Sequence, residues 1–365
     1  MGPSRQSSAP AAASPRHAPA GVAAGAILLA LAVTGCSSST TTPPAATASA
    51  TTSHTSTSTS TASALPAAGT VAATIPSIGA LTSKDDNYGI AADGTSVWIY
   101  NGDTGMVTRV TEATGAVAAT IPLHPGCSTG RGCGNLAVGD GGVWVANDAD
   151  GTITHIDPAS NRAVATISVG ATAAPQVYTT PGVVWSANYF ADSYTQIDPH
   201  TNAITGTLSH HLSAESVTLA AGSIWLCDAG GAPAVTRLDP SSGAVQSHFD
   251  FSTGSSIFCL DAAPLGSSLY VVTEGDTAKV IDAATGSTHD APAAPGKAHV
   301  ERGLVGGANG TWLIDADFGL FRLDPTTGGA VAQLPLTGAA GIADDGHSIW
   351  VISNDGSLSR ITPAA

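Results

Sequence analysis

Residues 142–158 read GVWVANDADGTITHIDP, and this stretch contains the pattern that decides the fold. Two short runs rich in β-branched and aromatic residues flank the polar segment Asp148–Gly151. Such runs with a Gly-containing segment between them are typical of two antiparallel strands joined by a hairpin. The second run ends in Ile156-Asp157-Pro158, where Asp and Pro favour a turn. The stretch therefore predicts two strands and then a turn.

The same pattern recurs along the chain at a spacing of about 40 residues, which is typical of propeller blades. All six Trp of the sequence occupy one position of the repeat, and Tyr occupies it in a seventh copy. These seven positions are Trp98, Trp144, Trp185, Trp225, Tyr270, Trp312 and Trp350. An apolar inner strand precedes the aromatic residue, and a fourth strand follows the turn. We therefore predict an all-β fold, a seven-bladed β-propeller.

The two ends of the repeat region indicate how the ring closes. The last copy stops after its third strand, at residues 360–363. Residues 69–76 (GTVAATIP) are nearly identical to residues 115–122 (GAVAATIP), which form a predicted fourth strand. We therefore expect residues 70–75 to supply the fourth strand of the last blade, which removes an exposed sheet edge.

An Asp follows the third predicted strand in most copies. The positions are Asp157, Asp198, Asp239, Asp282 and Asp324. An Asp side chain accepts bonds from nearby backbone N–H groups, and a following Pro presets the backbone for a turn. Because these residues recur in blade after blade, we assign them to the turns and not to catalysis.

The repeat, with its apolar-Trp-Val-Ala-Asn strand and its Ile-Asp-Pro-x-Thr/Ser-Gly ending, resembles the bacterial propeller superfamily of YVTN-type and NHL-type surface proteins and virginiamycin B lyase. The resemblance covers residues 70–363. It implies the fold and leaves the function open, because that superfamily includes both binding proteins and enzymes.

The N-terminal residues 1–35 have the features of an export signal. Arg5 and Arg16 provide a basic start, and an apolar run extends over residues 18–33. This run is short for a membrane span and has signal-peptide length. It ends in Val33-Thr34-Gly35-Cys36, which resembles the bacterial lipobox and implies lipidation of Cys36 after cleavage before it. An ordinary secretory signal or an uncleaved anchor, with Cys36 incidental, are the alternatives.

Residues 36–69 consist of the lipidated Cys and a segment made almost wholly of Ser, Thr, Ala and Pro. Such a segment lacks the large apolar residues that offset ordering entropy, so we predict a disordered spacer. The predicted domains are thus a signal peptide at 1–35, this linker at 36–69 and the propeller at 70–365.

The sequence has 12 basic and 27 acidic residues, a formal net charge of −15. Nucleic-acid binding needs a basic face, so we predict no nucleic-acid partner. Anionic lipid head groups would repel the chain, so its membrane contact must come from the lipid anchor. We expect a protein exported and anchored to the outer face of the bacterial membrane. It should be a monomer, because a closed ring needs no partner for stability.

Four cysteines remain besides Cys36, and an oxidising exterior would allow two disulfides. Cys127 and Cys133 flank a five-residue segment, which favours a local bridge. Cys227 belongs to the Trp strand of the fourth blade and Cys259 to the inner strand of the fifth, where neighbouring blades touch. A second bridge there depends on geometry. Zinc binding is the alternative, although no CxxC pair is present.

Ligands of propellers generally bind where the segments entering the inner strands meet at the channel mouth. Polar residues at or before these strands vary between blades, so turn chemistry does not account for them. The candidates for ligand binding are Tyr88, Arg131, Asn135, Gln176, Glu215 and Arg302. They suit a polar ligand such as a cell-wall glycan, a peptide or an envelope protein.

His299 and Glu301 form the sharpest candidate pair for catalysis. On an extended segment the two side chains point to the same side. They could act as a base with its orienting partner, or hold a divalent metal as cofactor. A solvated loop with mutually paired charges is the alternative interpretation.

Three functions follow from these features. The first, which we favour, is a membrane-anchored binding module with its ligand at the channel mouth. The second is a metal-dependent enzyme resembling virginiamycin B lyase, which would use His299 and Glu301. The third is a scaffold for other envelope proteins.

Overall fold

The computed structural model describes residues 65–78, 88–124, 135–170, 175–209, 214–228, 234–250, 259–273, 277–292, 303–315 and 317–364. The predicted signal peptide, Cys36 and most of the predicted linker lie outside these ranges. No helix in the described residues is both long enough and apolar enough to cross a membrane.

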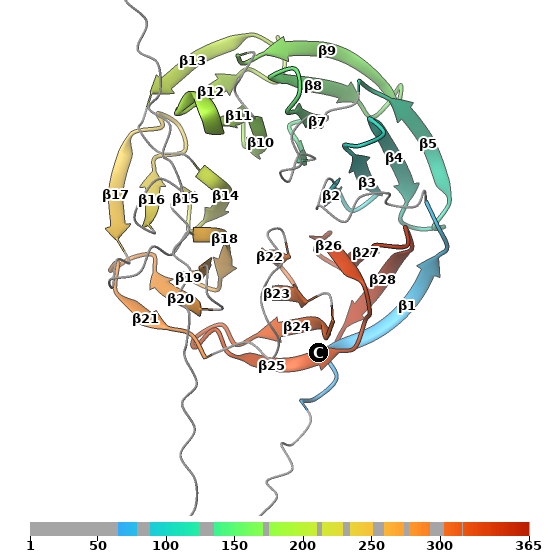
Figure 1. Ribbon diagram of the computed structural model, residues 1–365, viewed down its shortest axis with the longest axis vertical. Helices are drawn as coiled ribbons and strands as arrows, with labels where there is room; N and C mark the ends of the chain where they lie inside the picture. Colours follow the sequence, from blue (N-terminus) through green and yellow to red (C-terminus); the bar gives the residue numbers. More distant parts are fainter. Residues whose placement is uncertain are drawn as a thin grey trace, which may run out of the picture. The chain divides into compact units, whose positions relative to one another are not determined.

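The described strands form seven antiparallel sheets of four strands each, which we call blades 1 to 7 (Figure 1). From inner to outer strand, blades 1 to 3 are β2 (Tyr88–Ala92), β3 (Ser96–Asn101), β4 (Met106–Thr111), β5 (Val117–Pro122); β6 (Leu136–Gly139), β7 (Gly142–Asn147), β8 (Thr152–Asp157), β9 (Arg162–Ser168); and β10 (Pro175–Thr180), β11 (Val183–Asn188), β12 (Ser193–Ile197), β13 (Ile204–Ser209). A 3-10 turn, η1 (Tyr189–Ala191), lies between β11 and β12.

Blades 4 to 7 repeat this order. They are β14 (Ala214–Ala220), β15 (Ser223–Asp228), β16 (Ala234–Leu238), β17 (Val245–Asp250); β18 (Cys259–Leu265), β19 (Ser268–Thr273), β20 (Thr277–Asp282), β21 (Thr288–Asp290); β22 (Leu304–Gly307), β23 (Gly310–Asp315), β24 (Gly319–Leu323), β25 (Ala330–Leu334); and β26 (Ala339–Asp344), β27 (Ile349–Ser353), β28 (Leu358–Pro363), β1 (Gly69–Ile75).

The inner strands form a closed ring. Each of β2, β6, β10, β14, β18, β22 and β26 contacts the next, and β26 contacts β2 (Figure 1). The predicted seven-bladed propeller is therefore confirmed. The inner strands enclose a central channel, and we call the end where these strands begin the channel mouth.

The predicted closure is also confirmed. β1 pairs antiparallel with β28, from Gly69 opposite Pro363 to Ile75 opposite Leu358. The segment just before β1 reaches blade 6 as well, because Ala68 N–H donates to Gln333 O at 3.0 Å. The N-terminal strand therefore joins blades 6 and 7 to each other.

The aromatic position of the repeat is the centre of the packing between blades. Trp98 is fully buried in one cluster with Val143 and Val145 of the next blade. On the third strand an arginine lies over the indole in four blades, at 4.8–5.9 Å from guanidinium carbon to ring centroid, where a cation attracts the π system. These pairs are Arg109 with Trp98, Arg237 with Trp225, Arg322 with Trp312 and Arg360 with Trp350.

Three of these arginines, Arg109, Arg237 and Arg322, also bond to the following blade. Arg109 donates to Pro158 O at 2.6 Å, and Arg237 donates to Ala283 O at 2.9 Å. Both acceptors lie in the turn before the outer strand of the next blade. Each such arginine therefore supports its own Trp and ties two blades together.

The repeated aspartates have the structural role that the sequence predicts. The Asp239 carboxylate, for example, accepts N–H bonds from Ser241 at 3.1 Å and Ser242 at 2.8 Å. The hydroxyls and N–H groups of these two serines hold the pKa of Asp239 well below its usual range. Where most turns place Gly in the left-handed conformation, Asn161 takes it at φ 54°.

Blades 1 and 7 meet at a group of three carboxyls. Asp93 accepts the Trp98 indole N–H at 3.1 Å, and Asp345 accepts that of Trp350 at 2.8 Å. The Glu112 carboxyl is hydrogen-bonded to Asp345 and is only 8% exposed. Burial, the bond to Asp345 and the two neighbouring charges raise the pKa of Glu112 to about 7. Glu112 is therefore protonated in the folded chain at pH values where it would be ionised in the unfolded chain.

Glu112→Gln should remove the loss of stability at high pH that Glu112 causes where blades 1 and 7 meet. Because the pKa of Glu112 is raised in the folded state, its contribution to the stability of the fold is complete below pH 4.5. This contribution is lost as the pH rises through about 7. An amide keeps a neutral donor beside Asp345 at every pH. We expect the variant to match the wild type near pH 5 and to exceed its free energy of unfolding at pH 8 by about 1–2 kcal/mol, after allowance for solvent screening. Urea unfolding at both pH values measures this, and an identical pH dependence in both proteins would contradict it.

Candidate ligand site at the channel mouth

A cavity of about 150 Å³ lies at the start of the inner strands. Every blade contributes to its wall, which shows that it lies at the centre of the ring. One lining residue from each blade in turn is Ile90, Leu136, Gln176, Val217, Asp261, Leu304 and Ile342. The cavity is therefore the mouth of the channel, where the sequence analysis expects ligands.

One position of the repeat dominates the polar surface of this cavity. It lies nine residues before the aromatic position, and we call it the ring position. Blades 1 to 7 carry there, in order, Gly89, Asn135, Gln176, Ser216, Asp261, Gly303 and Gly341. All of them except Gly303 line the cavity. The ring positions of the mouth are therefore polar in blades 2 to 5 and glycine in blades 6, 7 and 1, where apolar neighbours such as Ile90, Leu304 and Ile342 complete the wall.

Local hydrogen bonds orient two of the four polar side chains. The Asn135 Oδ1 accepts the backbone N–H of Val177 in the next blade at 2.5 Å. The Tyr178 hydroxyl, which also lines the cavity, donates to the Gln176 Oε1. Gln176 and Tyr178 lie two residues apart on β10, so they project to the same face of the strand. The mouth is therefore preorganised on the side of blades 2 and 3.

Ser216 and Asp261 reach the ring position through irregular strands. The pairing of β14 with β15 shifts between Ala214 and Ser216, and that of β18 with β19 shifts between Cys259 and Asp261. Such bulges redirect side chains and recur beside functional sites. The Ser216 Oγ is buried and has no hydrogen-bond partner among the described residues. A buried hydroxyl without a partner costs free energy, which a bound polar group or a water molecule would recover.

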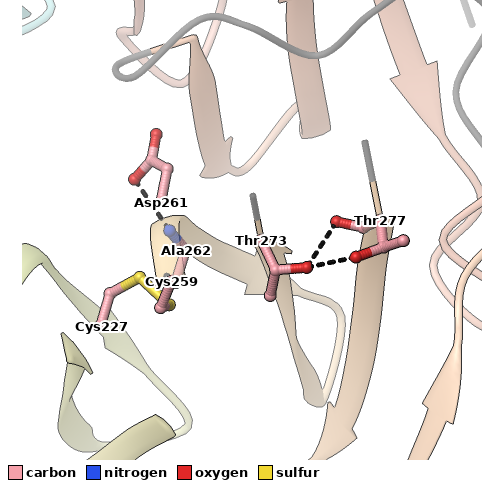
Figure 2. The surroundings of a disulfide bond; sticks show 6 residues. All are labelled: Cys227, Cys259, Asp261, Ala262, Thr273 and Thr277. Atoms are coloured by element: carbon pink, nitrogen blue, oxygen red, sulfur yellow. Dashed lines mark hydrogen bonds between the residues drawn. A yellow bond between two sulfur atoms is a disulfide. The ribbon is translucent and has the colours of Figure 1, made fainter. Parts of the chain in front are cut away.

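Asp261 is the charged residue of the mouth. It is 8% exposed, and its Oδ1 accepts the N–H of Ala262 at 2.8 Å. Figure 2 shows its carboxylate directed away from the neighbouring disulfide. A carboxylate walled in by apolar strands favours a ligand that brings positive charge or hydrogen-bond donors.

That disulfide joins Cys227 of β15 to Cys259 of β18, with the Cα atoms 5.3 Å apart (Figure 2). Both residues are fully buried. The second bridge, which the sequence left dependent on geometry, is present between blades 4 and 5, and for these two cysteines a disulfide replaces the zinc alternative. The bond fixes the start of β18, and therefore the backbone next to Asp261. Cys127 and Cys133 lie outside the described residues.

A second cavity of about 460 Å³ adjoins the first. The two share six lining residues: Asn135, Leu136, Tyr178, Val217, Asp261 and Leu304. From there the larger cavity continues along the inner strands of blades 1 to 6. It also reaches Trp185 and Tyr194 of blade 3 and Ile224 and Leu226 of blade 4. Its volume is in the range of small-molecule pockets, roughly 300–1,000 Å³.

A small side chain, Ala187, is part of the wall of the larger cavity. Ala187 lies two residues after the aromatic position, where blade 2 also carries an alanine, Ala146, and blades 1, 6 and 7 carry larger residues.

The structure brings together two of the predicted site residues, Asn135 and Gln176. Tyr88 begins β2 and Glu215 lies at the β14 bulge, but their side chains are not among those that the structure describes. The other predicted site residues lie outside the described ranges: Arg131, His299, Glu301 and Arg302. They stay predictions. Within the described residues, no group of three or more His, Cys, Asp or Glu side chains could hold a metal ion.

Sequence reasoning missed Ser216, Asp261 and Tyr178. A signal was available, because a count of nine residues back from each aromatic finds Ser216 and Asp261 together with Asn135 and Gln176.

No protein-family model matches this chain, and no curated protein sequence matches it. Solved structures do match. The WD40 domain of Pan2 from Neurospora crassa has a TM-score of 0.61 and 11% identity, over 83% of this chain and 98% of that one. Hydrazine synthase from Kuenenia stuttgartiensis has a TM-score of 0.61 and 15% identity, over 78% and 97%. BamB from Moraxella catarrhalis has a TM-score of 0.54 and 15% identity, over 80% and 99%. At such identities the likeness shows the fold alone: this chain is a β-propeller.

Proposed function

We propose that this protein is a membrane-anchored, extracytoplasmic binding module that holds a small polar ligand at the channel mouth. The observation that carries the proposal is the ring position. Four consecutive blades place Asn135, Gln176, Ser216 and Asp261 around one cavity, and glycines leave space opposite them. A concave site with a few convergent polar groups on rigid strands is the usual form of a ligand pocket.

The location rests on two supports. Disulfides persist in oxidising compartments, and Cys227 is bonded to Cys259. The lipobox-like ending at Cys36 supports a lipid anchor, with residues 36–69 as a spacer. The resemblance to the YVTN, NHL and virginiamycin B lyase superfamily is in keeping with both.

Thermal unfolding of the full chain with a library of small polar compounds tests the proposal. A compound that binds only the folded chain, at 100 times its dissociation constant, should add about 2.7 kcal/mol to the free energy of unfolding. Gln176→Ala should abolish that shift because it removes a mouth side chain. Gln246→Ala, on the outer strand β17, is the matched control and should retain it.

The same assay tests the lyase alternative when Ca²⁺, Mg²⁺, Mn²⁺ or Zn²⁺ is added after a chelator. A saturable metal shift that is lost in His299→Ala and kept in Gln176→Ala would contradict the mouth proposal and favour the enzyme. A ligand shift that survives Gln176→Ala would also contradict it.

A further inference from the structure

The chemistry of the two adjoining cavities restricts the ligand further, and this inference rests on the function proposed above. The cavities share Tyr178, Val217 and Asp261 on their walls. A ligand seated at the mouth can therefore extend into the space between blades 3 and 4 without crossing a packed layer. The two ends of such a ligand would meet different surroundings.

The end at the mouth meets a negative charge. Among the described residues that line either cavity, Asp261 alone carries a formal charge. A carboxylate in a poorly hydrated site attracts a cation strongly and rejects another anion. The net charge of −15 acts in the same direction over longer distances, because it concentrates cations near the protein. Tyr178, at the junction, adds an aromatic ring, which also favours a cation.

The other end meets an apolar surface. Trp185 and Tyr194 of blade 3 and Ile224, Leu226 and Leu238 of blade 4 belong to one apolar cluster, and all five line the larger cavity. The Trp185 indole N–H already donates to the Thr180 hydroxyl at 3.1 Å, so it does not require a ligand acceptor. Burial of apolar ligand surface here would favour binding.

We infer that the ligand is an amphiphilic amine, with its ammonium group at Asp261 and an apolar or aromatic body between blades 3 and 4. The other polar residues of the ring position would then accept or donate the remaining hydrogen bonds of the head group. The bulge before Asp261 and the residue Ala187 mark the two ends of the site.

Three probes of nearly equal size test the inference on the full chain: 2-phenylethylamine, 2-phenylethanol and 3-phenylpropionate. Dissociation constants come from titration calorimetry at pH 7. The amine should bind at least about tenfold more tightly than the alcohol, since a good charge-assisted contact contributes about 1.4 kcal/mol or more. The carboxylate probe should bind most weakly. Equal affinity for amine and alcohol, or no binding of the amine, would overturn the inference.

Two variants test which end of the probe binds at Asp261 and which end binds beside Ala187. Asp261→Asn should reduce the ratio of amine to alcohol affinity to about one while the alcohol still binds. Ala187→Leu should weaken both probes more than tenfold because it fills the space for the phenyl ring. Ala187→Val is the milder variant if the leucine prevents folding. Ala146→Val, at the equivalent place in blade 2 and outside both cavity walls, is the control and should leave both affinities unchanged. Selectivity that survives Asp261→Asn would refute the ammonium position.

The outcomes separate this inference from the proposed function. If polar compounds stabilise the chain in a manner that depends on Gln176, but none of the phenyl probes binds, the mouth site stands and the amphiphilic amine is wrong. If neither group of compounds binds, both are wrong.

Discussion

Deletion of residues 66–75 should abolish cooperative unfolding of the propeller. These residues include β1, which forms six residue pairs with β28, and the segment bonded to Gln333 of blade 6. Without them, β28 becomes an open edge and loses the cover of its buried residues Leu358 and Ile361. We expect a loss of more than about 5 kcal/mol, comparable to the whole stability of many domains.

Chemical denaturation followed by Trp fluorescence measures this loss. A deletion of equal length at residues 51–60, in the predicted linker, is the control and should leave the unfolding curve unchanged. A chain lacking 66–75 that unfolds at the wild-type denaturant concentration would show that the ring does not depend on this closure.

Loss of the disulfide between blades 4 and 5 should have the second largest effect. Cys227 and Cys259 are 32 residues apart, and closing a loop of this length restricts the unfolded chain by about 3–4 kcal/mol. The double variant Cys227→Ala/Cys259→Ala should therefore unfold at a lower free energy by about that amount.

Reduction of the protein provides the control. With Cys127 and Cys133 both replaced by alanine, a reductant should destabilise the chain by a similar amount. The same reductant should have no further effect once Cys227 and Cys259 are also replaced. A double variant within about 0.5 kcal/mol of the wild type would show that this bond does not stabilise the ring.

The fold could be predicted from the sequence because the ring repeats one local pattern seven times. Each Trp position identifies a second strand, and the match between residues 69–76 and 115–122 identifies the closing strand. The places of Cys227 and Cys259 in neighbouring blades made a bridge plausible, and the structure shows that their geometry allows it. These features depend on contacts within a blade or between successive blades, which the order of the repeats already defines.

The candidate site was predicted only in part, because its residue type changes from blade to blade although its spacing from the aromatic position does not. The prediction found Asn135 and Gln176, which enter their inner strands without a bulge. Bulges in β14 and β18 accompany the two residues it missed, Ser216 and Asp261. The space beside Ala187 exists because of how blades 3 and 4 pack, and a single blade does not reveal it. His299 and Glu301 stay predictions.

Residues that repeat in several blades stabilise the ring, whereas residues that change from blade to blade form the candidate site. The arginine over Trp225 and the turn carboxylate of Asp239 have counterparts in other blades, and they hold a uniform frame. The ring position changes from blade to blade, from Gly89 to Asp261, on that frame. A binding site placed there can vary while the packing that stabilises the ring stays the same.

A crystallographic fragment screen of the full chain tests most directly whether the channel mouth binds the ligand. Crystals soaked in a library of small polar fragments should show fragments bound between Gln176, Ser216 and Asp261, with a polar atom within hydrogen-bond distance of the Ser216 Oγ. Crystals of Gln176→Ala should show few or none there. Fragments bound only on the outer surface of the blades, with the mouth empty at every soak, would contradict the account.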